Sequence, residues 1–368
     1  MYAFSVRRLA LGVWRLPRCS AIPGSSLSPM AYVRLVFRGI LSQKAPSDSR
    51  RTPNAKRQTL NGYIAPLLFL VCAAPDANAG SRAFVLISKA LGNPFFAEVE
   101  RGAKEEADKL GCTVVQMGPA EANQASQIQI LRDVIVKGTD GIAISAVNAD
   151  ALIRPIEEAR AKGIPVVTFD SDSPNSKRQA YIGTNNFQGG VIAGNAFKDL
   201  MPKSGSYAIL TGTLASINLI ERIEGFKKAL GEGCNEVSGS PFSCEDSVPK
   251  SIQLIQDTLT KYPDLDGSFF AGGWPLLAGD AYIKALGRRG PEVKTKKFII
   301  VSFDTLPPIL KLLSLGYANA LVGQRPAEMG AKSIETLMAI CDKKPIQTVY
   351  DTGVDLVTPE NVDGFIKK

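Results

Sequence analysis

The sequence contains no histidine among its 368 residues. This absence excludes Ser-His-Asp and Cys-His catalysis, histidine metal ligands and a histidine pH switch. The sequence also shows no nucleophile paired with a base, no phosphate-binding glycine loop and no cluster of metal ligands. We therefore predict neither a metal nor a cofactor and expect the chain not to be an enzyme. Carboxylate-based chemistry in an exported enzyme stays open as an alternative.

Acidic residues are almost absent from the first 79 residues. This segment contains eleven lysines and arginines but only Asp48 and Asp76, while the whole chain has a net charge of +8. The remaining residues therefore have a net charge of −1. Because the basic excess belongs to this leader, the body of the chain gives no reason to expect binding to nucleic acid.

The chain also lacks an apolar run of the ~20 residues that a membrane-spanning helix needs. A shorter run, residues 63–74, follows two basic residues and precedes Ala77-Asn78-Ala79. Basic residues, an apolar core and a small-residue site in this order predict a secretory signal peptide that is cleaved before Gly80. A lipoprotein site at Cys72 is disfavoured because the preceding residue is bulky. For residues 1–55, a translation start further downstream and a disordered extension or transit peptide both stay open.

Cysteine is scarce, with six in the whole chain. Cys234 and Cys244 bracket a turn-rich segment, which in an exported protein predicts a local disulfide; two free thiols are the alternative. Their spacing fits no zinc site. Cys112 and Cys341 lie at or just past predicted helix ends; two buried free thiols and a bridge between them both stay open.

Apolar runs and helical patterns alternate along the rest of the chain. Short apolar runs bounded by Gly, Pro and Asp indicate buried parallel strands at residues 83–87, 113–116, 141–145, 165–169, 207–210, 268–270, 298–303 and 320–322. Helical spacing predicts helices at residues 94–110, 125–137, 149–162, 187–200, 218–230, 250–261, 275–288, 307–315 and 326–340. This alternation predicts doubly wound α/β sheets, and the length of the body favours two of them.

Polar residues and glycines follow four predicted strands at their carboxyl ends. These positions are Asp170, Asp304, Gln324 and the segment Gly272-Gly273-Trp274. Open α/β sheets bind their ligands at this edge. Each position alone is ordinarily a turn former or a helix cap, but the four together favour a binding site.

Two adjacent phenylalanines open the first predicted helix. Asn93 suits its N-cap, and Pro94 suits its first position. One helical face buries only one of two adjacent aromatic side chains. We therefore expect Phe95 or Phe96 to project toward the ligand-binding edge, with burial of both in the core as the alternative.

A set of segments follows in a characteristic order after Ser81. They are residues 93–96 (Asn-Pro-Phe-Phe), 107–111, 163–170, 189–190, 221–226, 301–304 and 323–326 with Gly330. In these segments the chain resembles the periplasmic sugar-binding proteins of ABC transporters, of the ribose-binding type. The resemblance implies two Rossmann-like, doubly wound parallel-sheet lobes joined by a three-segment hinge. Residues 80–184 with 325–353 would form one lobe, and residues 185–324 with 354–368 the other.

The resemblance also implies a ligand set. By matching position, Asn93, Asp170, Arg222, Asp304 and Gln324 would bind the sugar by hydrogen bonds, and Phe95 and Phe96 would pack on its apolar faces. The family's motion, in which the lobes close on the sugar, is implied with it.

Several positions depart from the pattern of ribose-binding relatives. Ser171 stands where they have an arginine, and Gly273 stands where they have an asparagine. A further aromatic contact aligns with Asp246, while Trp274 is new. We include Ser171, Gly273 and Trp274 among the predicted ligand-binding residues. Because a lost buried donor is costly, another pentose, a hexose or a polyol such as inositol is expected rather than ribose.

Together these features predict a monomeric periplasmic receptor that captures a neutral sugar or polyol and delivers it to an ABC permease of the inner membrane. A LacI-type effector-sensing domain of the same fold is the alternative. It requires a helix-turn-helix, whose pattern residues 1–60 do not show. A chemoreceptor or signal-molecule receptor also stays open.

Overall fold

The computed structural model describes residues 81–366. The predicted signal peptide, the cleavage site before Gly80 and Cys72 lie outside the described residues, so they stay predictions. Within residues 81–366, no helix combines the length and the apolar character that a bilayer crossing requires.

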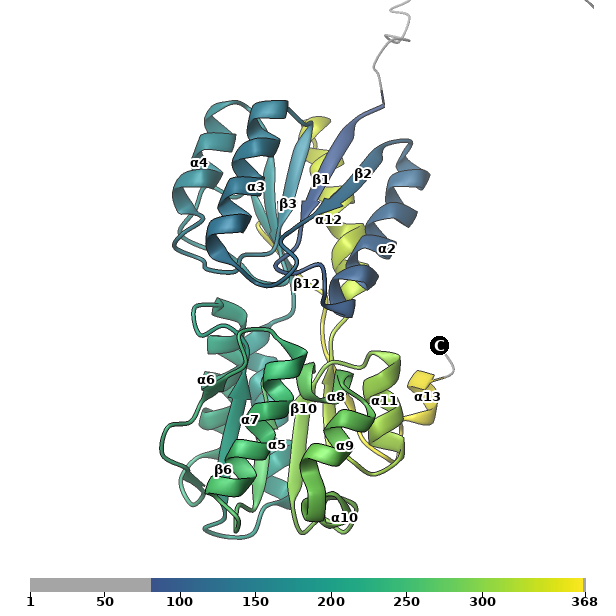
Figure 1. Cartoon of the computed structure of the whole chain (residues 1–368). Coiled ribbons are helices and arrows are strands. Elements are labelled where there is room, and N and C mark those ends of the chain that lie inside the picture. Colours follow the sequence, from purple (N-terminus) through teal and green to yellow (C-terminus); the bar gives the residue numbers. More distant parts are fainter. Residues whose placement is uncertain (1–80, 367–368) are drawn as a thin grey trace, which may run out of the picture. The chain divides into compact units, whose positions relative to one another are not determined.

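The first lobe is built on a sheet of six strands in the order β12-β5-β4-β3-β1-β2. Every neighbouring pair in this sheet is parallel. Its strands are β1 (Ala83–Ile87), β2 (Thr113–Met117), β3 (Gly141–Ile144), β4 (Val166–Phe169), β5 (Ala180–Gly183) and β12 (Val349–Asp351). Helices α2 (Pro94–Leu110) and α12 (Pro326–Cys341) cover one face, and α3 (Gln124–Lys137) and α4 (Ile153–Ala161) cover the other (Figure 1).

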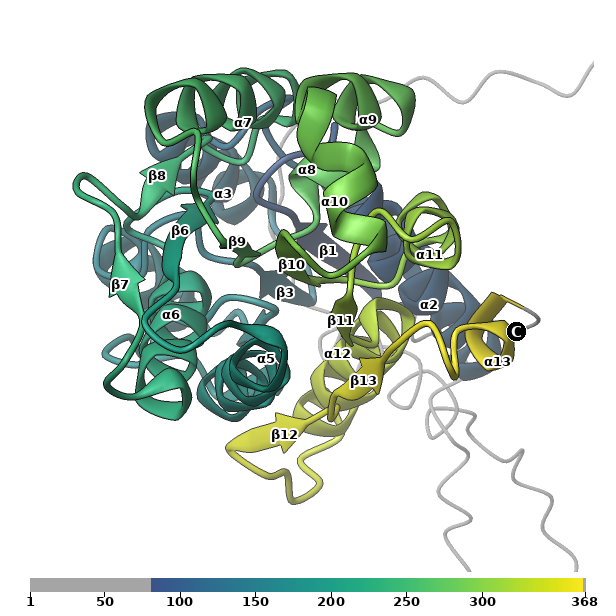
Figure 2. The same ribbon diagram turned by 90° about the horizontal axis from the view of Figure 1, so that it is seen from below.

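The second lobe is built on a sheet of seven strands, whose main path runs β13-β11-β10-β9-β6-β7. Its strands are β6 (Ser206–Thr211), β7 (Asn235–Glu236), β8 (Phe242–Ser243), β9 (Gly267–Phe270), β10 (Ile299–Phe303), β11 (Ala320–Gly323) and β13 (Asp355–Val357). Helices α5 (Asn186–Leu200) and α6 (Ile217–Leu230) lie on one face. Helices α7 (Val248–Lys261), α8 (Trp274–Leu277), α9 (Asp280–Leu286), α10 (Gly290–Lys294) and α11 (Pro307–Ser314) lie on the other (Figure 2).

The chain passes between the two sheets three times. It leaves the first sheet after β5, returns after β11 through α12 to β12, and then enters the second sheet again as β13. A short helix, α13 (Asp363–Ile366), ends the described chain. The prediction of two doubly wound parallel sheets with three connections is therefore confirmed.

Helix α2 begins and ends where its sequence predicts. The Asn93 side chain accepts a hydrogen bond from the backbone nitrogen of Phe95 at 3.0 Å, and Pro94 occupies the first turn. Gly111 ends the helix in the left-handed conformation, with φ of 67°. This capped start matters because it fixes the two phenylalanines at the carboxyl edge of β1.

Glycines let one helix pair in each lobe come unusually close. A Cβ on Gly330 of α12 would lie 1.9 Å from the backbone oxygen of Val99 on α2. In the second lobe, a Cβ on Gly190 of α5 would lie 2.1 Å from the backbone oxygen of Arg222 on α6, and one on Gly225 would lie 2.0 Å from that of Phe187. No larger residue fits these crossings, so the glycines set where α6 holds its polar side chains.

The helix predicted at residues 275–288 is interrupted. It is divided into α8, α9 and a 3-10 turn at Gly287–Arg289. Gly279 and Gly287 have φ values of 55° and 51°, outside the right-handed helical region; Gly279 directly precedes α9, and Gly287 ends α9 and begins the 3-10 turn.

The predicted disulfide between Cys234 and Cys244 is wrong, because the cysteines of the described residues are free thiols. Strands β7 and β8 both run parallel to β6, but β7 pairs with Ser206 at its start and β8 with Thr211 at its end. This stretch of strand spans about 17 Å. The two cysteines lie beyond its opposite ends, whereas a disulfide requires Cα atoms within about 7 Å.

Candidate functional site

A cavity lies at the carboxyl ends of strands from both sheets. It is lined by Lys89, Asn93, Phe95, Phe96 and Asp170 of the first lobe, by Asn218, Leu219, Arg222, Asp246, Gly272, Trp274 and Asp304 of the second, and by Gln324 at the crossing between them. Most of the residues that the sequence predicts for the site therefore come together in one place. Ser171 and Gly273 are the two predicted residues that do not line it.

Those two residues lie behind the cavity wall. The Gly273 backbone nitrogen donates to Oδ2 of Asp304 at 3.0 Å, and a Cβ here would lie 2.4 Å from Ile309. Ser171 is buried, and its hydroxyl has no hydrogen-bond partner. Gly273 thus positions a carboxylate, while the neighbouring Gly272 lines the cavity.

Both phenylalanines are buried and both line the cavity. Phe95 is 5% and Phe96 4% exposed, and their ring centroids are 5.4 Å apart in an edge-to-face arrangement. Phe96 in turn packs edge-to-face on Phe169 of β4. Both rings thus reach the ligand-binding edge, where one was expected, and both are buried there. Edge-to-face packing lets two adjacent rings share one buried site.

Asp170 directly follows β4 and has a left-handed backbone conformation, with φ of 57°. Its Oδ2 accepts a hydrogen bond from the Ser145 hydroxyl at 2.6 Å and lies 3.4 Å from Nζ of Lys89. Its Oδ1 accepts from Nδ2 of Asn218 at 3.3 Å. The carboxylate is thus held by contacts from both lobes.

Lys89 and Asn218 also line the cavity, although neither is among the residues predicted from the sequence. They are 4% and 2% exposed, and Nζ of Lys89 donates to Oδ1 of Asn218 at 3.2 Å. Lys89 lies two residues beyond β1, at the same sheet edge as Asp170. Asn218 precedes Arg222 by four residues, which places both on one face of α6. These two signals are present in the sequence and would have identified both residues.

Arg222 is buried and donates three hydrogen bonds within the protein. Its guanidinium donates to Oδ1 of Asn186 at 2.9 Å, to the backbone oxygen of Ala271 at 3.0 Å and to Oε1 of Gln324 at 2.6 Å. It also lies over the Phe303 ring, 4.2 Å from the centroid. Burial lowers the pKa of this guanidinium, and nearby carboxylates oppose that shift. The remaining donors of the planar fork are available to a ligand.

Asp304 repeats in the second lobe the conformation of Asp170 in the first. It directly follows β10 and has φ of 75°. Its backbone nitrogen donates to Val322 of the next strand, as that of Asp170 does to Ile182. Non-glycine residues in this region are strained by about 1–3 kcal/mol. The same strained turn therefore aims one carboxylate from each sheet into the cavity.

Burial raises the pKa of Asp304 above its usual 3.8, while Arg222 and the hydrogen bond from Gln324 counteract the rise. The proton therefore binds at a higher pH than it does to an exposed aspartate. Once protonated, this group loses part of its capacity to accept hydrogen bonds from a ligand.

We therefore expect the affinity for a hydroxyl-bearing ligand to fall as the pH is lowered through this raised pKa, beginning above the range in which an exposed aspartate titrates. Calorimetric Kd values measured between about pH 7 and pH 4 test this expectation. The Asp304→Asn variant should bind more weakly at pH 7 and show a flatter profile. A variant with the same acid-induced loss as the wild type would show that another group is responsible.

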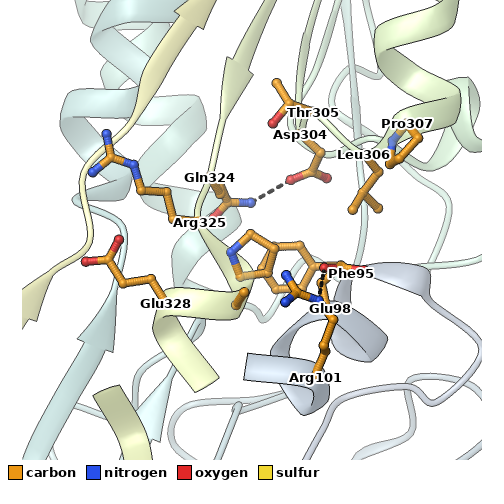
Figure 3. Close-up of a pocket in the computed structure, with 12 residues that line it drawn as sticks. Phe95, Glu98, Arg101, Asp304, Thr305, Leu306, Pro307, Gln324, Arg325 and Glu328 are labelled. Atoms are coloured by element: carbon orange, nitrogen blue, oxygen red, sulfur yellow. Dashed lines mark hydrogen bonds and ion pairs between the residues drawn. The ribbon is translucent and has the colours of Figure 1, made fainter. Parts of the chain in front are cut away.

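A wider pocket of about 530 Å³ adjoins the cavity (Figure 3). Phe95, Asp304 and Gln324 line both, and the hydrogen bond from Nε2 of Gln324 to Oδ1 of Asp304, at 2.7 Å, lies at their common wall. The wider pocket continues along the start of α2, the loop after β10 and the start of α12. These three residues therefore separate the cavity from the wider pocket.

The described residues contain no group of three or more potential ligands that could hold a metal ion. The cavity instead offers hydrogen-bonding groups of both signs beside aromatic rings. Such a set can hold a polyhydroxylated molecule without reacting with it.

Comparison with known families identifies the chain. The model of the periplasmic binding protein domain matches residues 84–345. The chain belongs to this family. Its members bind solutes for transport, so the prediction that the chain is not an enzyme is confirmed at the level of the family, as is the resemblance to sugar-binding proteins of the ribose type.

Relatives within the family match nearly their whole length. The ribose import binding protein RbsB of Escherichia coli is 27% identical over 81% of this chain and 98% of its own. The D-allose-binding periplasmic protein of E. coli is 28% identical over 69% of this chain and 83% of its own. A solute-binding protein of an ABC transporter from Burkholderia graminis, solved with D-arabinose, is 34% identical and covers 77% of this chain and 97% of its own, with a TM-score of 0.70.

Proposed function

We propose that this protein is an exported receptor that binds one neutral sugar or polyol in the cavity between its lobes and delivers it to an ABC permease. The observation that carries this proposal is the composition of the cavity wall. Three aspartates, an arginine, a lysine and three amides surround a space that is also lined by three aromatic rings.

This composition matches the chemistry of a sugar. Each sugar hydroxyl both donates and accepts, so carboxylates serve as acceptors, Arg222 and Lys89 as donors, and amides as either. Hydrogen bonds to charged groups are the stronger kind. The C–H face of a pyranose or furanose is apolar and is covered by aromatic rings such as Phe95 and Phe96.

The relatives support a sugar as the class of ligand. Their names record ribose, D-allose and D-arabinose as ligands. For this chain we favour a pentose other than ribose, a hexose or a polyol, because Ser171 and Gly273 replace an arginine and an asparagine of the ribose-binding pattern. Lys89 adds a buried donor.

We further propose that the lobes close on the ligand, with residues 80–184 and 325–353 moving against residues 185–324 and 354–368. Contacts between the lobes support this motion. The Ser216 hydroxyl donates to the backbone oxygen of Val147 at 3.0 Å, and Asn218 contacts both Lys89 and Asp170. We place the protein in the periplasm as a monomer, after removal of residues 1–79.

A thermal-shift screen of the exported protein tests the proposal. The panel contains D-ribose, D-arabinose, D-allose, D-galactose and myo-inositol. A ligand present at about 100 times its Kd stabilises the folded state by about 2.7 kcal/mol. The absence of a shift with every compound, or chemical conversion of a bound compound, would overturn the proposed function.

The Asp304→Ala variant should weaken binding of the compound identified in this screen by about 1.5–3 kcal/mol, the size of a hydrogen bond to a charged group. Calorimetry measures the loss, which corresponds to roughly a tenfold to hundredfold change in Kd.

The Trp274→Ala variant should lose less binding free energy than Asp304→Ala, about 0.5–1.5 kcal/mol if the ring only covers a C–H face. Unchanged affinity in Asp304→Ala would remove this residue from the site.

A further inference from the structure

Trp274 has a buried polar atom that the protein itself does not satisfy. The residue lines the cavity, is 6% exposed, and its indole Nε1 has no hydrogen-bond partner. A buried N–H without a partner costs about 1–3 kcal/mol, so native proteins rarely leave one unpaired. A ligand group in the cavity would remove this cost.

Two glycines create the space in which this ring lies. A Cβ on Gly272 would be 2.5 Å from the six-membered part of the indole, and one on Gly212 would be 2.7 Å from it. The same Cβ on Gly212 would also be 2.7 Å from Oδ1 of Asp246. Asp246 and Trp274 are therefore neighbours across Gly212, and both line the cavity.

Only one of the two oxygens of the Asp246 carboxylate accepts hydrogen bonds from the described residues. Its Oδ2 accepts hydrogen bonds from the backbone nitrogen of Thr213, at 3.0 Å, and from the Thr213 hydroxyl. Its Oδ1 accepts none within the described residues. Asp246 has φ of 61° and the preceding Glu245 has φ of 52°, so a strained turn presents this carboxylate to the cavity.

The pair combines one free acceptor with one free donor. A hydroxyl can donate to Oδ1 of Asp246 and accept from Nε1–H of Trp274 at the same time. An ammonium group cannot accept, a carboxylate cannot donate, and a C–H group does neither. We infer that Asp246 and Trp274 jointly bind one hydroxyl group of the ligand and so select neutral sugars over amino sugars, uronic acids and the corresponding deoxy sugar.

The distribution of charge agrees with a neutral group at this point. The other two aspartates of the cavity each have a cationic neighbour, Asp170 in Lys89 and Asp304 in Arg222. Asp246 has no ion-pair partner within 81–366 and would attract an ammonium group if it acted alone. The N–H of Trp274 would oppose this, because it would face a group without an acceptor.

This inference rests on the proposed function, and its test separates the two. Calorimetry is carried out with the tightest binder of the panel named above and with its monodeoxy and monoamino analogues. The proteins are the wild type, Trp274→Phe, which keeps a ring but lacks the N–H, and Asp246→Ala. Glu245→Gln is the matched control, since it changes the charge of the adjacent residue, which does not line the cavity.

In the wild type, removal of the hydroxyl that faces the pair should weaken binding about tenfold or more. In Trp274→Phe and in Asp246→Ala this penalty should fall to about threefold or less, at the same ring position in both variants. In Trp274→Phe the amino analogue at that position should gain affinity relative to the parent sugar, because the opposing N–H is gone. Glu245→Gln should reproduce the wild-type profile.

Penalties that stay as in the wild type at every position, or that fall at different positions in the two variants, would overturn the inference while leaving the proposed function intact. Binding of no compound by the wild type would overturn both. If Asp246→Ala does not fold, the response of Trp274→Phe to the deoxy and amino analogues decides alone.

Discussion

Replacing Arg222 with methionine is expected to weaken sugar binding about a hundredfold or more and to lower the free energy of unfolding by about 3–5 kcal/mol. The side chain is 2% exposed and satisfies three protein acceptors at once. Methionine fills part of the volume but leaves those oxygens without donors. It also leaves Asp304 without the cation that stabilises its ionised form.

Calorimetry and urea unfolding measure the two effects of this substitution separately. Arg222→Lys keeps the charge, but a single ammonium cannot reproduce the planar fork, so it should recover only part of each loss. Arg178→Met is a matched control. Arg178 pairs with Asp172 at 2.7 Å outside the cavity, so its loss should affect stability and leave affinity unchanged. Full affinity in Arg222→Met would remove this residue from the ligand site.

Replacing Gly225 with alanine is expected to destabilise the second lobe by about 3 kcal/mol or more, at the upper end of the cost of overpacking. The new methyl group would lie 2.0 Å from the backbone oxygen of Phe187, which belongs to a rigid helix and cannot turn away. Helices α5 and α6 would have to separate. Because α6 carries Asn218 and Arg222, ligand affinity should fall along with stability.

The matched control for this substitution is Gly364→Ala in α13. A Cβ at Gly364 would meet nothing within 4 Å, so the same chemical change should be neutral or slightly stabilising there. Urea unfolding of both variants gives the comparison. A Gly225→Ala protein as stable as the wild type would mean that the α5–α6 crossing relaxes easily.

The sequence contains most of the fold because buried parallel strands are apolar on both faces. Strands such as β1 and β10 therefore appear as short apolar runs, and their observed bounds lie within a residue of the prediction. Strands β5, β7, β8, β12 and β13 were not predicted from the sequence. The last four have only two or three residues and lie at sheet edges, where half-exposed side chains leave no apolar run.

The candidate site was predictable where a residue directly follows a strand, as Asp170 and Asp304 do. Contacts between side chains that are far apart in the sequence were not predictable. Local sequence does not reveal that Lys89 reaches Asn218 of the other lobe. It also does not reveal that two short strands lie far apart along β6, which is why a short separation between Cys234 and Cys244 wrongly suggested a disulfide.

Helix α12 and strand β12 belong to the first lobe but are synthesised late. This order constrains when the lobe can fold during synthesis. Tyr181 of β5 pairs with Val349 of β12, and α12 packs on α2 near the start of the body. At synthesis rates of about 5–20 residues per second, β12 is synthesised roughly 10–30 s after β5, the strand with which it pairs. Until then neither lobe can complete its sheet, because β13 follows later still. A nascent chain that is kept from folding until its synthesis is nearly complete is suited to passage through a membrane channel in extended form.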